Sequence, residues 1–132
     1  MKSFADTSFF VALLNDRDTH HATAVRLGTE FAGTIVTSQW VLLEFANYFA
    51  ASKFRSLVSP FVESLLVDPA LVCVAADPTT FAEGLALYRD RPDKLWSLTD
   101  CCSIVIMERQ SIRSALTADH HFEQAGFEIL LK

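Results

Sequence analysis

The sequence predicts an α/β fold with three layers, in which helices cover both faces of a mostly parallel sheet of about five strands. Short apolar segments of strand length alternate with amphipathic segments of helix length, and this alternation implies right-handed crossovers between parallel strands. Hydrophobic residues make up 51% of the 132 residues. That is enough for one packed core, so we expect a single domain over residues 1–132.

The first half of the chain is expected to contribute two strands and four helices. The strands are at residues 1–5 and 34–37, and the helices at residues 9–14, 19–31, 39–51 and 60–67. Asp18 is the expected N-cap of the second helix, because a short acidic side chain accepts hydrogen bonds from the free N–H groups of a helix start. Ala22, Ala24 and Val25 are expected on its inward face.

The second half repeats the alternation. Strands are expected at residues 71–75, 114–117 and 127–130, and helices at residues 78–89, from the turn before Asp100 to about residue 109, and at residues 119–124. Asp77-Pro78 is a cap followed by a proline at the first helical position. Thr37 or Ser38 should cap the helix at 39–51. Residues 90–94 form a polar, basic-leaning loop.

Charge and composition limit the function classes. The net charge is −5, which argues against a general nucleic-acid coat protein but allows a nuclease whose acids gather around a metal ion. No apolar run has the roughly 20 residues of a membrane span, and the N-terminal residues lack the pattern of a secretory signal. The three cysteines contain no CxxC pair, so we expect reduced thiols in the cytoplasm.

Three aspartates fall at the ends of expected elements. Asp6 ends the first strand, Asp119 follows the fourth, and Asp100 opens the helix that leads into the fourth. In parallel sheets, sites form beyond the carboxyl ends of the strands. Each acid also has a purely structural interpretation: Asp6 and Asp119 as helix N-caps, and Asp100 as the partner of Ser97 in a capping box.

Glu44 lies on the apolar stripe of its expected helix, among Trp40, Val41, Phe45 and Tyr48. Burying a glutamate there costs several kcal/mol unless it is paired, protonated or bound to a metal. The structural alternative is a salt bridge to an arginine.

Together, the four acids suggest a cluster that needs a cation, because gathered like charges repel. Oxygen ligands select Mg²⁺ or Mn²⁺ over zinc. Such an ion lowers the pKa of a bound water and stabilises an in-line displacement at phosphorus. Nearby hydroxyls could orient the carboxylates or hold waters; they belong to Thr7, Ser8, Thr99 and Thr117.

Four motifs follow one another along the chain: Asp-Thr-Ser at 6–8, Glu-Phe-Ala-Asn at 44–47, Ser-Leu-Thr-Asp-Cys at 97–101 and Leu-Thr-Ala-Asp-His-His-Phe at 116–122. With these motifs the chain resembles the PIN-domain family, and more narrowly the VapC-type toxins of toxin–antitoxin pairs. The resemblance implies a PIN-like fold and a Mg²⁺- or Mn²⁺-dependent endoribonuclease. It also implies a cognate antitoxin that lies across the active-site groove, and a homodimer.

The resemblance implies roles for individual residues. Asp6, Asp100 and Asp119 match the metal ligands, and Glu44 completes the acidic quartet, directly or through water. The supporting polar residues are Thr7, Ser8, Asn47, Thr99 and Thr117. Arg91, Lys94 and His120 are candidates for substrate contact. Arg17, Lys53, Arg55 and Arg89 are further candidates for phosphate contact, although an ordinary solvated charge is the favoured interpretation of each basic side chain.

Other interpretations remain open from the sequence. A haloacid-dehalogenase-type phosphatase also begins with an aspartate after the first strand, but it needs a second acid two residues later, where this chain has Ser8. A receiver-like or metal-free PIN-like binding module would be non-catalytic. We expect surface or capping roles for the pairs His20-His21 and His120-His121, because adjacent histidines point to different faces.

Overall fold

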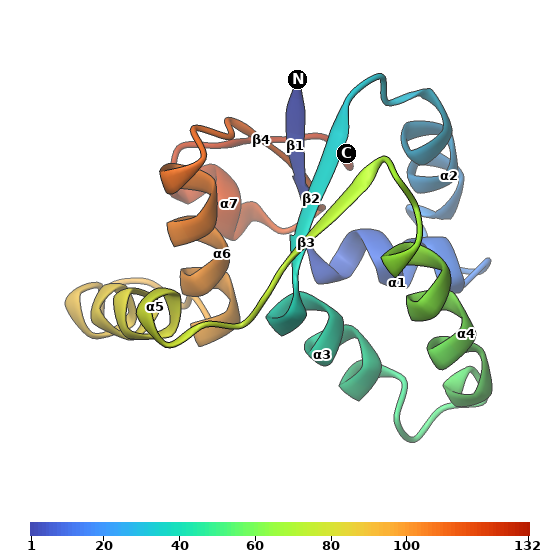
Figure 1. Ribbon diagram of the computed structural model, residues 1–132, viewed down its shortest axis with the longest axis horizontal. Helices are drawn as coiled ribbons and strands as arrows, with labels where there is room; N and C mark the ends of the chain where they lie inside the picture. Colours follow the sequence, from blue (N-terminus) through green and yellow to red (C-terminus); the bar gives the residue numbers. More distant parts are fainter.

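Five parallel strands form the single sheet of the computed structural model, which describes residues 1–132 (Figure 1). The strands are β1 (Lys2–Ala5), β2 (Thr34–Ser38), β3 (Leu71–Val74), β4 (Ser114–Leu116) and β5 (Glu128–Ile129). They lie in the order β3-β2-β1-β4-β5, and every neighbouring pair is parallel. The predicted sheet is confirmed.

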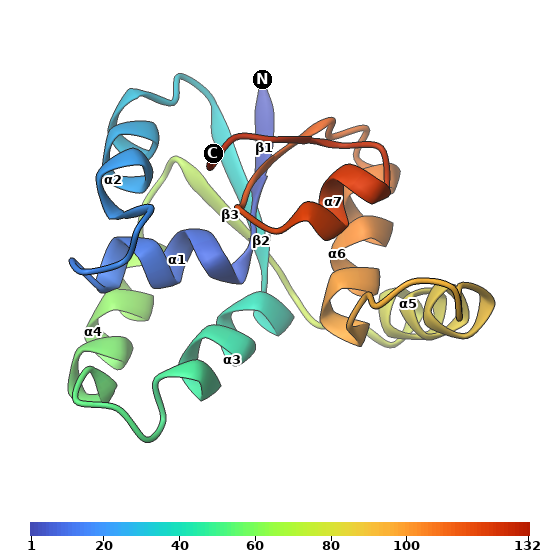
Figure 2. The ribbon, with the colours of Figure 1, turned by 180° about the vertical axis from the view of Figure 1, so that it is seen from behind.

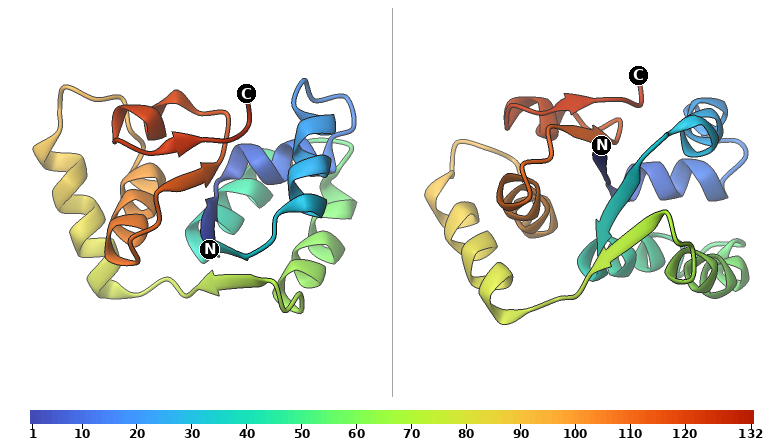
Figure 3. Two further views of the ribbon diagram at one scale, coloured as in Figure 1. Left: turned by 90° about the horizontal axis from the view of Figure 1, so that it is seen from above. Right: turned by 45° about the horizontal axis from the view of Figure 1, so that its top comes forward.

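Helices cover both faces of the sheet, which confirms the three-layer prediction (Figures 1 and 2). One side carries α1 (Thr7–Leu14), α2 (His21–Glu30), α3 (Gln39–Tyr48) and α4 (Arg55–Leu66). The other side carries α5 (Pro78–Asp90), α6 (Leu98–Arg109) and α7 (His120–Gln124). Figure 3 shows these two groups on either side of the twisted strands. None of the helices has the length and hydropathy to cross a lipid bilayer.

The central strand β1 places the carboxyl ends of two strands side by side. Phe4 lies opposite Val36 of β2 and Ala115 of β4, and Ala5 lies opposite Leu116. All five of these residues are at most 1% exposed, so the sheet centre is anchored in the core. The residues that follow β1 and β4 therefore emerge next to each other at one edge of the sheet.

Helix caps form where short polar side chains precede apolar segments. The Ser38 side chain accepts a hydrogen bond from the backbone N–H of Val41, and Asp77 accepts one from that of Thr80. Pro78 occupies the first turn of α5, where a missing N–H loses no helical bond. These predicted helix starts are confirmed.

The expected start of α4 at Pro60 is wrong, because the helix already begins at Arg55. Val58, in the turn before the proline, is only 8% exposed. Burial of this side chain stabilises a turn that the proline pattern alone would exclude. The helix α3 ends at Tyr48 instead of residue 51, because Ser52 and Ala50 form a turn that binds back to Phe49 and Asn47.

The orientation of α2 also differs from the expectation. Its N-cap is His20, and the Asp18 side chain instead accepts a hydrogen bond from the His20 backbone N–H in the preceding turn. Val25 and Ala22 are exposed, whereas Ala24 is fully buried as predicted. The ring Nδ1 of His21 lies 2.7 Å from a carbonyl oxygen of α1, that of Ala12, and this contact selects the inward face. The remaining boundaries lie within two residues of expectation.

Candidate metal-binding active site

Asp6, Asp100 and Asp119 converge at the edge of the sheet where β1 and β4 end. One carboxylate oxygen from each lies within 4.8 Å of the others. Asp6 is 3% exposed and Asp100 is 6% exposed, whereas Asp119 is half-buried. The structure therefore brings together the three acids that the sequence placed at element ends.

Burial dominates the electrostatics of this cluster. Loss of hydration raises the pKa of Asp6 to about 7, and the charges of Asp100, Glu44 and Asp119 add to the rise. The pKa of Asp100 is raised by the same burial and by the charge of Asp119. A group of carboxylates this close is unfavourable in its ionised form unless a cation neutralises it.

Hydrogen bonds from neighbouring hydroxyl groups hold the Asp6 carboxylate in place. The Thr117 hydroxyl donates to Asp6 Oδ2 over 3.1 Å and accepts from the backbone N–H of Asp119 over 3.0 Å. Ser8 Oγ lies 2.9 Å from Thr117 Oγ1 and accepts from the backbone N–H of Ala118. With Ser8 donating to Thr117, every hydroxyl proton in the chain of bonds has an acceptor, so Asp6 is held in one orientation.

Glu44 reaches the cluster from α3. Its Oε1 accepts a hydrogen bond from the Thr7 hydroxyl. The side chain is half-buried, and it forms no ion pair with any lysine or arginine. The alternative of a salt bridge to an arginine is therefore rejected.

The acids line an open pocket of about 300 Å³. Its other walls are Thr7, Ser8, Val11, Asp18, His20 and Tyr48. Within it, Asp6 Oδ1 is buried without any hydrogen-bond partner, which is costly for a carboxylate oxygen. The available metal ligands are all oxygens, and one of them has no hydrogen bond. Such a set of ligands fits a hard divalent cation.

Capping and clustering coexist at Asp100 and Asp119. Ser97 and Asp100 form the predicted capping box, with a backbone-to-side-chain bond of 3.0 Å in each direction. Asp119 Oδ1 accepts the backbone N–H of His121 at the start of α7. Asp6 occupies the N-cap position of α1, but its side chain makes no capping bond. The capping interpretations of Asp100 and Asp119 are thus correct, and both side chains still line the pocket.

Some predicted supporting residues lie outside the pocket. Thr99 is half-buried and its hydroxyl makes no hydrogen bond, while Asn47 is exposed on α3. Arg91 and Lys94 line a separate cavity of about 810 Å³ beside the first turn of α6. The Arg91 guanidinium is paired with Asp93 at 3.0 Å.

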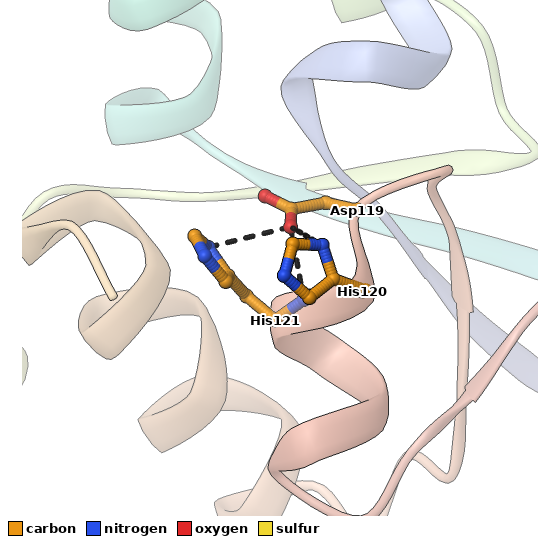
Figure 4. Close-up of side chains that lie close together, drawn as sticks. All are labelled: Asp119, His120 and His121. Carbon is orange, nitrogen blue, oxygen red and sulfur yellow. Dashed lines mark hydrogen bonds and ion pairs between the residues drawn. The ribbon is translucent and has the colours of Figure 1, made fainter. Parts of the chain in front are cut away.

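His121 is a site residue that the sequence reasoning missed. Its Nδ1 lies 3.1 Å from Asp100 Oδ2 and 3.3 Å from Asp119 Oδ1, and its side chain is 19% exposed. Figure 4 shows His121 and His120 beside Asp119. His120 is largely exposed, with Nδ1 3.9 Å from Asp119. The expected surface or capping role is wrong for His121, and the available signal was its place two residues after a candidate ligand.

A family model described as PIN domain matches residues 3–128 of the chain. The chain belongs to the PIN-domain family. PIN-domain nucleases depend on divalent metal ions, and the clustered acids of this PIN domain are consistent with that chemistry.

Known proteins resemble this PIN domain over nearly its full length. The 23S rRNA-specific endonuclease VapC20 of Mycobacterium tuberculosis is 32% identical over 126 residues, which cover 94% of each chain. The crystal structure of M. tuberculosis VapC20, a Sarcin-Ricin loop cleaving toxin, superposes with a TM-score of 0.87, 24% identity and 96% coverage of both chains.

Two further crystal structures share the fold. VapBC2 from Rickettsia felis, bound to a DNA fragment from its promoter, has a TM-score of 0.68 at 14% identity, and covers 98% of this chain and 97% of that one. FitAcB from Neisseria gonorrhoeae has a TM-score of 0.66 at 15% identity, with coverages of 98% and 96%.

Proposed function

We propose that this PIN domain is a metal-dependent endoribonuclease that hydrolyses RNA phosphodiester bonds and acts as the toxin of a type II toxin–antitoxin pair. The observation that carries the proposal is the meeting of Asp6, Asp100, Asp119 and Glu44 at one open pocket, with an unpartnered buried oxygen on Asp6. The similarity to VapC20, a named 23S rRNA endonuclease, supports RNA as the substrate.

Asp6, Asp100 and Asp119 would hold Mg²⁺ or Mn²⁺, with Glu44 contributing directly or through a water. When bound, the ion supplies a water of lowered pKa and stabilises charge at the reacting phosphate. Thr7 orients Glu44, and Thr117 with Ser8 orients Asp6, so that these carboxylates need no rearrangement to bind.

The proposed substrate contacts are His120 at the acidic pocket and two basic side chains of the neighbouring cavity. His120 is exposed beside Asp119. Lys94 makes no ion pair and lies over the Trp96 ring, with Nζ 6.0 Å from the ring centroid, so its charge is available to a phosphate. Arg91 has its charge paired with Asp93 and would contribute less unless RNA displaces that acid.

The proposed partners follow from the relatives. VapBC2 is a two-component complex by its name, which supports a cognate antitoxin for this chain, and we also propose a homodimer. The proposed location is the cytoplasm, where RNA and reduced thiols are both found.

Cleavage of ribosomal RNA in the presence of Mn²⁺ or Mg²⁺ tests the function. Wild-type protein should cut, and both EDTA and Asp100→Asn should abolish cutting while the fold is retained. Asn keeps an oxygen that can accept the Ser97 N–H, so the capping box survives. Asp16→Asn, at an exposed position outside the pocket, is the matched control and should cut normally. Cutting by Asp100→Asn at the wild-type rate would rule out the assignment.

The other candidate functions have less support in the structure. A haloacid-dehalogenase-type phosphatase needs an acid at position 8, and the Ser8 hydroxyl found there is already bound to Thr117 and Ala118. A non-catalytic module would not need four acids at one pocket. Calorimetry in which wild-type protein fails to bind Mn²⁺ at millimolar concentration would favour that module.

A further inference from the structure

In each of the three clustered aspartates, one carboxylate oxygen accepts a hydrogen bond from the protein and the other oxygen accepts none. The held oxygens are Asp6 Oδ2, bound by Thr117, Asp100 Oδ2, bound by Ser97 and His121, and Asp119 Oδ1, bound by His121. The remaining oxygens are Asp6 Oδ1, Asp100 Oδ1 and Asp119 Oδ2. A carboxylate fixed through one oxygen presents the other in a defined direction.

His121 is the side chain that contacts two of these carboxylates at once. Its Nδ1 lies within 3.3 Å of an oxygen on each of Asp100 and Asp119. Ionised carboxylates, the form that binds a cation, only accept hydrogen bonds, so in that form Nδ1 carries the shared proton. The backbone N–H of His121 donates to Asp119 as well, over 2.9 Å. One residue thus supplies donors to both acids.

The two acids need such a link because they come from different elements. Asp100 lies in the first turn of α6, whereas Asp119 precedes α7, a helix of five residues. Apart from His121, the Trp96 indole N–H donates to Gln124 on α7, and this contact lies at the far end of that short helix. The imidazole is therefore the side chain that joins the two carboxylates directly.

We propose that His121 is a positioning residue, which holds Asp100 and Asp119 at the separation that a divalent cation requires and thereby raises the affinity for that cation. This inference rests on the proposed metal-dependent function. Groups that orient metal ligands typically change metal affinity by about 10- to 100-fold when they are removed. His121 acts through the held oxygens and leaves the others for the ion.

Mn²⁺ binding, measured by titration calorimetry on the full chain, tests the role of the Nδ1 donor. Asn places its amide nitrogen where His has Nδ1, so His121→Asn should bind Mn²⁺ within about threefold of wild type. Gln places its amide nitrogen near the position of Nε2, and Leu has no donor. His121→Gln and His121→Leu should therefore bind about 10- to 100-fold more weakly.

Glu123→Gln is the control and should bind like wild type, because this side chain is exposed on the same helix α7 and makes no hydrogen bond or ion pair. Wild-type affinity in His121→Leu would overturn the positioning role, as would equal losses in His121→Asn and His121→Leu. If leucine prevents folding, the comparison of Asn with Gln decides the same question. Failure of wild-type protein to bind Mn²⁺ would instead overturn the proposed function and the positioning role together.

Discussion

The Thr7 hydroxyl donates a hydrogen bond to Glu44 Oε1 and so joins the first turn of α1 to the middle of α3. The contact spans 37 residues of sequence. It leaves Oε2 of Glu44 without a hydrogen bond in the protein, at the wall of the acidic pocket. Glu44 is thus held by its neighbour and available to a water or an ion.

Thr7→Val should therefore lower the free energy of unfolding by about 1 kcal/mol, since valine keeps the shape but loses the donor. RNA cleavage should also slow, because Glu44 is no longer oriented. Urea unfolding of Thr7→Val, Glu44→Leu and the double variant measures the coupling between the two side chains, because neither replacement keeps its half of the hydrogen bond. Thr29→Val, at an exposed position of α2, is the control. Strictly additive effects would contradict the proposed coupling.

Asp6 should make the metal-free protein less stable as pH rises. Its pKa is raised from 3.8 to about 7 by burial and by the charges of Asp100, Glu44 and Asp119. Between these values the folded protein binds more protons than the unfolded chain, so the free energy of unfolding falls with increasing pH. The stabilising contribution is complete below the unfolded pKa and is lost by about pH 7.

Urea unfolding in EDTA at about pH 5 and about pH 7 measures this slope. Asp6→Asn, which cannot ionise, should show a flatter dependence than wild type. Saturating Mn²⁺ should reverse the trend, because the ion binds the deprotonated acids and stabilises the folded state. A slope that is unchanged in Asp6→Asn would assign the pH dependence to other groups.

Gly84→Ala should destabilise the protein by about 1–3 kcal/mol through overpacking between α5 and α6. A Cβ at this position would lie 2.6 Å from Cys102 Sγ and 3.2 Å from Cys102 backbone atoms. Gly28→Ala is a matched control in α2, where the nearest atom is 3.6 Å away, and it should gain up to about 1 kcal/mol from helix propensity. Thermal melts compare the two; equal effects would refute the packing argument.

Lys94→Ala should weaken RNA binding and reduce the slope of log affinity against log salt concentration by about one. Lys94 forms no ion pair, whereas Arg91 in the same loop is bound to Asp93 through both Nε and Nη2. Arg91→Ala should therefore have a smaller effect. Filter binding of RNA to the Asp100→Asn protein at several salt concentrations measures both. A larger loss of RNA affinity in Arg91→Ala than in Lys94→Ala would contradict the greater role given to Lys94.

Much of the fold was predictable because its signals are local. A cap followed by proline at Asp77-Pro78, and serines at positions 38 and 97, mark helix starts through hydrogen bonds that span only three residues. The parallel sheet followed from alternation alone. Since such a sheet aligns the carboxyl ends of its strands, the meeting of Asp6 and Asp119 was also predictable.

The missed features depend on contacts between distant segments. The first turns of α4 form because Val58 is buried, and no local pattern around Pro60 indicates that burial. In the sequence His121 is one of two adjacent histidines, which predicts an exposed side chain. In the structure α7 places its ring between Asp119 and Asp100, and Asp100 lies 21 residues earlier. The outward orientation of Val25 likewise depends on how α2 packs on α1.

The central position of β1 has a consequence for the timing of synthesis. β1 is made before its neighbours and can pair with β2, which in turn pairs with β3, but its other edge stays open until β4, which begins at Ser114, is made. Asp6 and Glu44 are then present long before Asp100 and Asp119. A nascent chain therefore lacks the complete acidic site until Asp119 has been made, so the proposed ribonuclease cannot be active before then.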